Sequence, residues 1–371
     1  MERTGIAELP LHYGKAPPWL INRMRKLAGQ IVAIVIDECG QDELLRRLSD
    51  PHWFQALGCV LGYDWHSSGL TTVVTAVLKQ AVNPEEHRLA VAGGKGRFSR
   101  RTPKEIERFG EVFGFSEDQL HSLQYASRMS AKVDNAAIQA GCPLYHHTFF
   151  TTEDGRWAVI QQGMDTRDRT ARRYHWISDH VKSFVDEPHE AIVSEVFKNQ
   201  VLNMTARESE EPRRISTDLV KDDPQRVERD FKSLRPAKQR ALSEWLPGVE
   251  GKNRSVRILT LPKRINWAAL KQAYEFQPRN YEELLSTKGI GPATVRGLAL
   301  VSEVIYGKSP SWKDPAKFSF AFGGKDGVPY PVNRRAMDEA HQMLKSAVDE
   351  AKIEKREKLK AFKRLSDFVV K

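Results

Sequence analysis

The amino-acid sequence predicts a predominantly helical α+β protein, with a small antiparallel sheet in its N-terminal part and an all-helical C-terminal part. Helix start signals recur along the first third of the chain. Aromatic and β-branched residues then flank an Asp-Gly pair within Leu144–Met164, which is typical of a β-hairpin. Helical patterns dominate from Asn266 to the end. Because 371 residues exceed the usual size of a single core, we expect two or three domains.

Capping residues, prolines and glycines mark the N-terminal helices. Gly40 should close one helix, and Asp50 should cap another that has Pro51 at its first position. Thr102-Pro103-Lys104-Glu105 predicts a capping box at the start of a further helix. The expected helices in the first part are Trp19–Glu38, Asp42–Leu48, Pro51–Gly62 and Ser68–Val82, with a short strand at Leu89–Ala92.

The hairpin register follows from its turn. If Asp154-Gly155 forms a two-residue turn, the strands pair by counting outward from it. Phe150 then lies opposite Val159, and Thr148 lies opposite Gln161. His147 lies opposite Gln162 in the same register, which a β-bulge would break.

Composition divides the chain into three parts. We predict an N-terminal domain over residues 1–205 that holds the sheet and a candidate catalytic body. Residues 206–240 are rich in charge and poor in large apolar side chains, which indicates a linker or a mobile segment. Residues 241–371 should form a helical domain with a helix–hairpin–helix at 280–307.

Net charge, cysteine content and hydropathy narrow the class of protein. The formal net charge of +10 favours a polyanionic partner. Cys39, Cys59 and Cys142 lack the paired spacing of a zinc site, and so sparse a set fits a reducing compartment. The strongest apolar stretch, Ile31–Ile36, is too short to cross a bilayer. We therefore expect a cytoplasmic protein without a membrane partner.

Two glycines carry the clearest functional signal. Asn280 should cap a short helix that leads into Lys288–Thr294, where Gly289 and Gly291 bracket Ile290. Pro292 suits the first turn of the next helix. Such a hairpin presents backbone N–H groups at a helix N-terminus, where phosphate oxygens bind. The predicted contacts with nucleic acid are Lys288, Gly289, Ile290, Gly291, Thr294 and Arg296.

This pattern resembles the helix–hairpin–helix motif of DNA repair and replication proteins. Some relatives with this motif are DNA glycosylases, and the lyase-active ones carry a lysine two residues after the second glycine. Ala293 occupies that position here, and Asn333 stands where a catalytic aspartate would be expected. Both departures argue against base excision. An ordinary packing turn between two helices is the alternative.

Further basic residues are candidates for phosphate contact. Gly93–Gly96 with Lys95 indicates a second phosphate-binding loop. It lacks the spacing and the Ser/Thr of a Walker A loop, so no nucleotide cofactor is indicated. Arg172 and Arg173 lie beside Tyr174 and suit phosphate contact, or else form a salt-bridged helix surface.

The candidate catalytic residues are Asp64, His66, Asp134, His147 and Gln162. Asp64, Asp134 and His147 could ligate Mg²⁺ or Mn²⁺, which could generate a nucleophile for phosphodiester cleavage. A glutamine stands where such sites usually carry a glutamate. The alternatives are a turn at Asp64 and a buried hydrogen-bond network around Asp134 and His147.

Several segments together resemble a prokaryotic and archaeal family of unknown function, number 763. The segments are Leu9–Leu20, Phe54–Gly58, Asp64–Gly69, Ala92–Gly96 and Val159–Met164. This resemblance spans nearly the whole chain and implies a prokaryotic cytoplasmic protein with a link to DNA processing.

Two classes of function follow. The first is a metal-dependent nuclease that grips the DNA backbone without sequence specificity. The second is a noncatalytic DNA- or RNA-binding or scaffold protein, since backbone contacts alone do not separate the two nucleic acids. A homo-oligomer is left open, because many DNA-processing proteins are symmetric assemblies.

Overall fold

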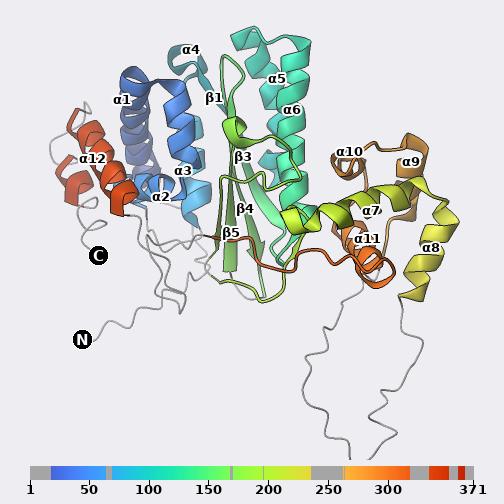
Figure 1. Cartoon of the computed structure of the whole chain (residues 1–371). Helices are drawn as coiled ribbons and strands as arrows, with labels where there is room; N and C mark the ends of the chain where they lie inside the picture. Colours follow the sequence, from blue (N-terminus) through green and yellow to red (C-terminus); the bar gives the residue numbers. More distant parts are fainter. Residues whose placement is uncertain are drawn as a thin grey trace, which may run out of the picture.

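A five-stranded antiparallel sheet in the order β1-β3-β4-β5-β6 forms the middle layer of the fold (Figure 1). The computed structural model describes residues 18–63, 69–167, 170–194, 196–234, 262, 264–317, 334–350 and 358–363. The strands of the sheet are β1 (Leu89–Lys95), β3 (Leu144–Thr152), β4 (Trp157–Asp165), β5 (Thr170–Ile177) and β6 (Ala191–Ser194). A separate pair joins β2 (Ile138–Gln139) to β7 (Leu202–Asn203).

Helices cover both faces of the sheet, and the predicted predominantly helical α+β class is confirmed. The first group is α1 (Pro18–Ser49), α2 (Pro51–Val60), α3 (Gly69–Ala81) and α4 (Pro84–His87). The second is η1 (Gly96–Arg101), α5 (Thr102–Phe113), α6 (Glu117–Lys132), the π-helical turn η2 (Val133–Ala137) and η3 (Ser178–His180). The third is η4 (Arg207–Ser209), α7 (Glu210–Lys221), α8 (Pro224–Ser233), α9 (Trp267–Phe276), α10 (Tyr281–Ser286), α11 (Pro292–Val304) and α12 (Arg334–Glu350).

The predicted helices of the N-terminal layer are present, although α2 ends at Val60 and not at Gly62, and α4 was not predicted. Gly40, with φ of 83°, interrupts α1 between the two helices expected there. The Asp50 carboxylate accepts hydrogen bonds from the amides of His52 and Trp53 at 2.7 and 2.8 Å, which caps α2. These helices pack on the face of the sheet that carries Val91, Phe150, Ala158 and Ile160, and a continuous apolar core forms between them.

The hairpin between β3 and β4 has a longer turn than predicted. Its loop is Glu153–Gly155, closed by a hydrogen bond from the Thr152 amide to the Arg156 carbonyl at 3.0 Å. Gly155 adopts φ of +86°, as the last residue of a three-residue hairpin loop does. The predicted register is therefore wrong by one residue. Phe150 lies opposite Ala158, Thr148 opposite Ile160, and His147 opposite Gln161.

The predicted start of α5 is right, but its capping box is wrong. The Glu105 carboxylate accepts from the Gly93 amide at 2.7 Å and from Lys79 Nζ at 2.6 Å, so it ties α5 to β1 and α3. The Thr102 hydroxyl donates to the Ser99 carbonyl at 2.7 Å. Neither side chain makes the reciprocal bonds of a capping box, because Glu105 has tertiary partners and Thr102 bonds a carbonyl three residues earlier.

Residues 206–234 are not the linker that we predicted. They contain η4, α7 and α8, whose sparse apolar side chains Leu219, Val220, Val227 and Phe231 are buried. Few apolar residues suffice because α7 and α8 bury one narrow face against α9, α10 and α11. Residues 235–240 of the predicted linker lie outside the described part of the chain.

The C-terminal residues divide between the two sides of the sheet. Figure 1 shows α7 to α11 together on one side, whereas α12 lies beside α1 and α2 on the other. Leu344, Ala347 and Val348 of α12 join the core of those N-terminal helices. The predicted helical unit 241–371 is therefore shared between two packing layers. No helix in the described ranges is long and apolar enough to cross a membrane.

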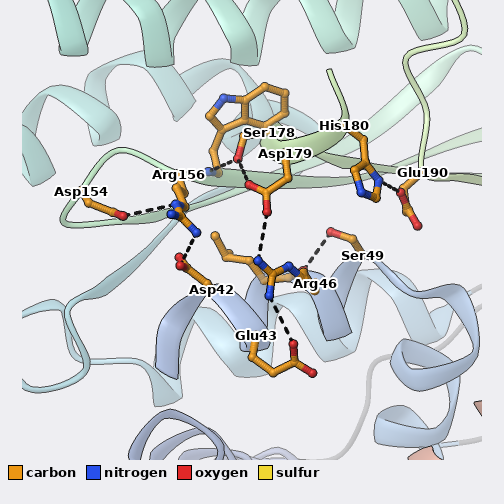
Figure 2. A network of polar contacts seen from close by, with 12 residues as sticks. Asp42, Glu43, Arg46, Ser49, Asp154, Arg156, Ser178, Asp179, His180 and Glu190 are labelled. Carbon is orange, nitrogen blue, oxygen red and sulfur yellow. Dashed lines mark hydrogen bonds and ion pairs between the residues drawn. The ribbon is translucent and has the colours of Figure 1, made fainter. Parts of the chain in front are cut away.

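Paired charges tie one end of the sheet to α1, as Figure 2 shows. Arg156, beside the hairpin loop, contacts Asp42 and Asp154. Arg46 contacts Asp179 of η3 at 3.3 Å and Glu43 at 3.6 Å. Exposed pairs of this kind contribute little stability individually. The opposite end, where β1 and β4 finish, carries the features described next.

Candidate nucleic-acid interface

A tight turn, Thr287–Gly291, joins α10 to α11 at the place that the glycine spacing predicted. The Asn280 side chain caps α10 by accepting from the Glu283 amide at 2.9 Å. Ile290 is fully buried and holds the turn against the core. Gly289 adopts φ of +87°, and a Cβ there would lie 2.8 Å from Ala269 Cβ. Glycine is required at this position for both reasons.

The outer side of this turn is open. Lys288 and Gly289 are exposed, and a Cβ built on Gly291 would meet nothing nearer than the Gly289 carbonyl oxygen at 4.0 Å. Gly291 is the N-cap of α11 and offers no side-chain acceptor to the first turn. Among the described residues, no acceptor is found for the amides of Gly289, Gly291, Ala293 and Thr294. These donors and the positive end of the helix dipole can bind an anion.

Neighbouring elements hold the turn in place from behind. Lys132 Nζ, at the end of α6, donates to the Thr287 carbonyl at 3.3 Å. Gln139 Nε2 of β2 donates to the Pro292 carbonyl at 2.8 Å. Asn266 Nδ2, before α9, donates to the Gly289 carbonyl at 3.3 Å. The carbonyls of Thr287, Gly289 and Pro292 are thus already hydrogen-bonded, whereas the amides of the turn named above have no acceptor among the described residues.

Two of the residues predicted to contact nucleic acid, Thr294 and Arg296, are buried or half-buried. Thr294 is buried as a whole residue, so neither its side chain nor its backbone amide is open to a ligand. Arg296 is half-buried, with its guanidinium 5.3 Å from the centre of the Trp312 ring, and burial lowers its pKa. Lys288 is the predicted basic residue that this turn presents to solvent.

The second predicted phosphate loop is a strand end. Gly93 and Gly94 belong to β1 and pair with Thr148 and His147. A Cβ on Gly93 would lie 2.2 Å from the His147 carbonyl oxygen, so glycine permits close strand approach there and forms no loop. Lys95 is exposed at the end of β1, with Nζ 5.7 Å from the Tyr145 ring centre.

Arg172 and Arg173 are buried in β5, which corrects their prediction as phosphate contacts. Arg172 donates to Asp314 Oδ2 at 2.6 Å. Arg173 donates to His175 Nε2 at 2.8 Å and to Gln55 Oε1 at 3.1 Å, and burial lowers its pKa to about 9. Their side chains point to opposite faces of the sheet, since successive strand residues alternate. Neither reaches a surface where a nucleic acid could bind.

Asp134 and His147 lie in one buried network, as the structural alternative predicted. His147 Nδ1 contacts Gln161 Oε1 at 2.8 Å, and its Nε2 contacts the Ser127 hydroxyl at 2.9 Å. Since an amide oxygen only accepts, Nδ1 carries the proton and Nε2 accepts from Ser127. The Gln161 amide nitrogen donates to Asp134 Oδ2. The network joins α6 and η2 to the middle of the sheet.

Both carboxylate oxygens of Asp134 have polar partners. Oδ2 also accepts from Trp176 Nε1 at 3.0 Å, and Oδ1 contacts His189 Nε2. Burial lowers the pKa of His147, against the raising effects of Gln161 and Asp134, so the ring is neutral. Ser127 and His147 are 3% and 5% exposed, so a substrate cannot reach the serine hydroxyl in this arrangement.

Of the remaining predicted catalytic residues, Gln162 does not join this network. Gln162 is buried on the opposite face of the sheet, where its Nε2 donates to the Tyr145 hydroxyl at 2.6 Å. Asp64 and His66 lie outside the described residues. Within the described part of the chain, no group of three or more His, Cys, Asp or Glu could hold a metal ion.

Sequence reasoning did not single out His189 or Trp176 as partners of Asp134. Both reach it from elements distant in sequence, and neither sits in a local motif. Gln161 had a usable signal, because it shares the odd-numbered face of β4 with Val159. A correct turn length would have placed it opposite His147.

Comparison with curated proteins and with solved structures finds no match for this chain. A model of the family described as "Protein of unknown function (DUF763)" matches residues 5–332. That range spans the sheet, the helices α1 to α11 and the α10–α11 turn, and it ends before α12. The chain therefore belongs to the DUF763 family.

Proposed function

We propose that this protein binds the phosphate backbone of DNA through the turn Thr287–Gly291 and the first turn of α11, as a helix–hairpin–helix does. The observation that carries the proposal is the set of amides without an acceptor among the described residues at Gly289, Gly291 and Ala293, none of them buried, with the exposed Lys288 beside them. Amide donors at a helix N-terminus bind phosphate oxygens and do not read base edges. Binding should therefore be independent of sequence.

The net charge of the chain supports a polyanionic ligand. A protein with a surplus of ten positive charges is attracted to nucleic acid over several ångströms at low salt. Each phosphate that is neutralised releases counterions, so affinity should fall steeply as salt rises. The sparse cysteines and the motif resemblance fit a cytoplasmic, prokaryotic setting for this binding.

Phosphodiester hydrolysis is the second candidate. One observation favours it: Asp134 and His147 of the predicted site belong to one connected cluster. The donors that already occupy Asp134 oppose it, since a metal ion would have to displace them. Binding without cleavage is accordingly the function that we place first.

The direct test is equilibrium binding of labelled duplex DNA, measured by fluorescence anisotropy across a range of salt. We expect the protein to raise the anisotropy of the DNA. The affinity should fall as salt rises and should be the same for DNA of unrelated sequences. Parallel incubations with Mg²⁺, Mn²⁺ and chelator test cleavage. Cleavage that Asp134→Asn abolishes in a folded protein would move hydrolysis to first place. Equal affinity for duplex RNA would widen the ligand to both nucleic acids.

A further inference from the structure

An exposed aromatic ring stands among arginines at the end of β1. Phe98, in the turn η1, is 42% exposed. The guanidinium carbons of Arg97 and Arg101 lie 5.4 and 5.1 Å from the centre of its ring. Lys95 and Arg100 are exposed beside them. Among the described residues, none of these four basic side chains forms an ion pair, unlike Arg46 and Arg156 at the other end of the sheet.

The turn is built to hold the ring outward. Gly96 enters it with φ of +60°, and its carbonyl accepts from the Ser99 hydroxyl at 2.7 Å. The Ser99 carbonyl accepts from Thr102 at the same distance, which joins the turn to α5. A Cβ on Gly94 would lie 3.3 Å from Phe98 Cβ, so glycine lets the turn pack directly against β1. The turn that carries the ring is thus tied to both β1 and α5.

The chemistry of this surface fits single-stranded nucleic acid. An exposed ring can stack on a base only where that base is free of its own duplex stack. Arginines around the ring supply charge for the phosphates that flank such a base. A duplex offers phosphates to the arginines but no free base face to Phe98. The ring is therefore the feature that selects an unpaired strand.

We propose that η1 is a base-stacking platform for single-stranded nucleic acid, with Phe98 as the stacking ring and Lys95, Arg97, Arg100 and Arg101 as phosphate contacts. This inference rests on the proposed function, because it adds a site for an unpaired strand of the nucleic acid whose backbone is bound at Thr287–Gly291. The turn η1 leads into the start of α5, and Lys132 at the end of the antiparallel α6 holds the α10–α11 turn. Both surfaces therefore lie at the same end of the α5–α6 pair.

The test compares Phe98→Ala, Phe98→Tyr and the full-length parent protein on an oligothymidylate and on a duplex of equal length. Phe98→Ala should weaken binding of the single strand roughly 10-fold, within the range for loss of one stacked base. Phe98→Tyr should restore it, and the duplex affinity should change less than about twofold. Trp19→Ala is the matched control. The Trp19 ring on α1 is also exposed, at 60%, and also has an arginine, Arg23, over it.

The outcomes separate this inference from the proposed function. Lys288→Glu is measured on the same two ligands. If only Phe98→Ala lowers single-strand affinity while Lys288→Glu changes nothing, the platform stands and the hairpin proposal fails. Unchanged single-strand affinity in Phe98→Ala overturns the platform. An equal loss on duplex and single strand also overturns it, as does a parent protein that binds duplex alone. A melting temperature equal to the parent's verifies that the exposed substitutions leave the fold intact.

Discussion

His189 Nε2 contacts Asp134 Oδ1 in a pair whose side chains are 7% and 0% exposed. The imidazole also packs on the Trp176 ring, with centroids 4.3 Å apart. Asp134 thus connects the loop before β6 with η2 and with the central strands β4 and β5. A carboxylate buried in this way persists because several donors surround it, and it holds the layers of the fold in one arrangement.

Asp134→Asn should destabilise the protein by about 3 kcal/mol, because the new amide group would turn a donor toward a donor. Chemical denaturation measures the change. Glu107→Gln, an exposed change on α5, is the control and should alter stability by less than about 0.5 kcal/mol. If Asp134→Asn keeps the parent's stability and loses a catalytic activity, the structural role assigned to this network is incorrect.

Asp314→Asn should cost about 3 kcal/mol, because it leaves the fully buried Arg172 without its carboxylate partner. The segment that carries Asp314 also pairs with the sheet region through the bond from the Asn203 amide to the Ser311 carbonyl at 2.9 Å. Thermal melting of Asp314→Asn, with Glu153→Gln as the control, measures this loss of stability. The Arg88–Glu153 pair is exposed, so its loss should cost under about 1 kcal/mol. Equal losses in the two variants would contradict the assignment.

Acid should destabilise the fold through its buried histidines. Burial lowers the pKa of His146 from 6.5 to about 3, and it lowers the pKa values of His147 and His175 as well. Below pH 6.5 the unfolded chain binds protons that the folded chain does not, so stability falls as pH drops from 6.5 toward 3. His146→Asn should reduce that slope by roughly 1 kcal/mol per pH unit. An unchanged slope in denaturation measured at several pH values would show that His146 is protonated in the fold.

The two glycines of the α10–α11 turn should respond differently to alanine. Gly289→Ala should cost about 2 kcal/mol, because φ of +87° and the contacts with Ala269 and Asn266 both oppose a Cβ. Gly291→Ala should cost less than about 1 kcal/mol, since its surroundings are open. Denaturation of the two variants side by side measures the difference. A larger cost at Gly291 would show that the turn has another conformation.

The sequence predicted the fold class, most of the N-terminal helices and the α10–α11 turn because local rules determine them. Asp50, Asn280 and Gly40 act within one helical turn of their own positions. Local rules could not predict how the helices pack across the layers of the fold. The charged face of α7 and α8 hid a narrow apolar stripe, and α12 gave no local sign that it would join α1 and α2.

The candidate site was predicted in part, and one residue of turn length explains much of the error. Asp134 and His147 do share a network, but a two-residue turn placed Gln162 opposite His147, where Gln161 actually lies. Shifting a strand by one position moves every side chain to the other face. Arg172 and Arg173 were predicted to be surface charges because the sequence alone does not show that Asp314 and Gln55 accept their hydrogen bonds inside the fold.

The most direct test of the account is the affinity for duplex DNA of Gly291→Val and Lys288→Glu, measured by anisotropy beside the parent protein. The valine should cover the first-turn amides of α11, and the glutamate should repel phosphate, so each should weaken binding roughly 10-fold. Lys345→Glu, the same charge change at an exposed position on α12, should change the affinity far less than Lys288→Glu. Parent-like affinity in both folded hairpin variants would contradict the claim that the turn between α10 and α11 binds the DNA backbone.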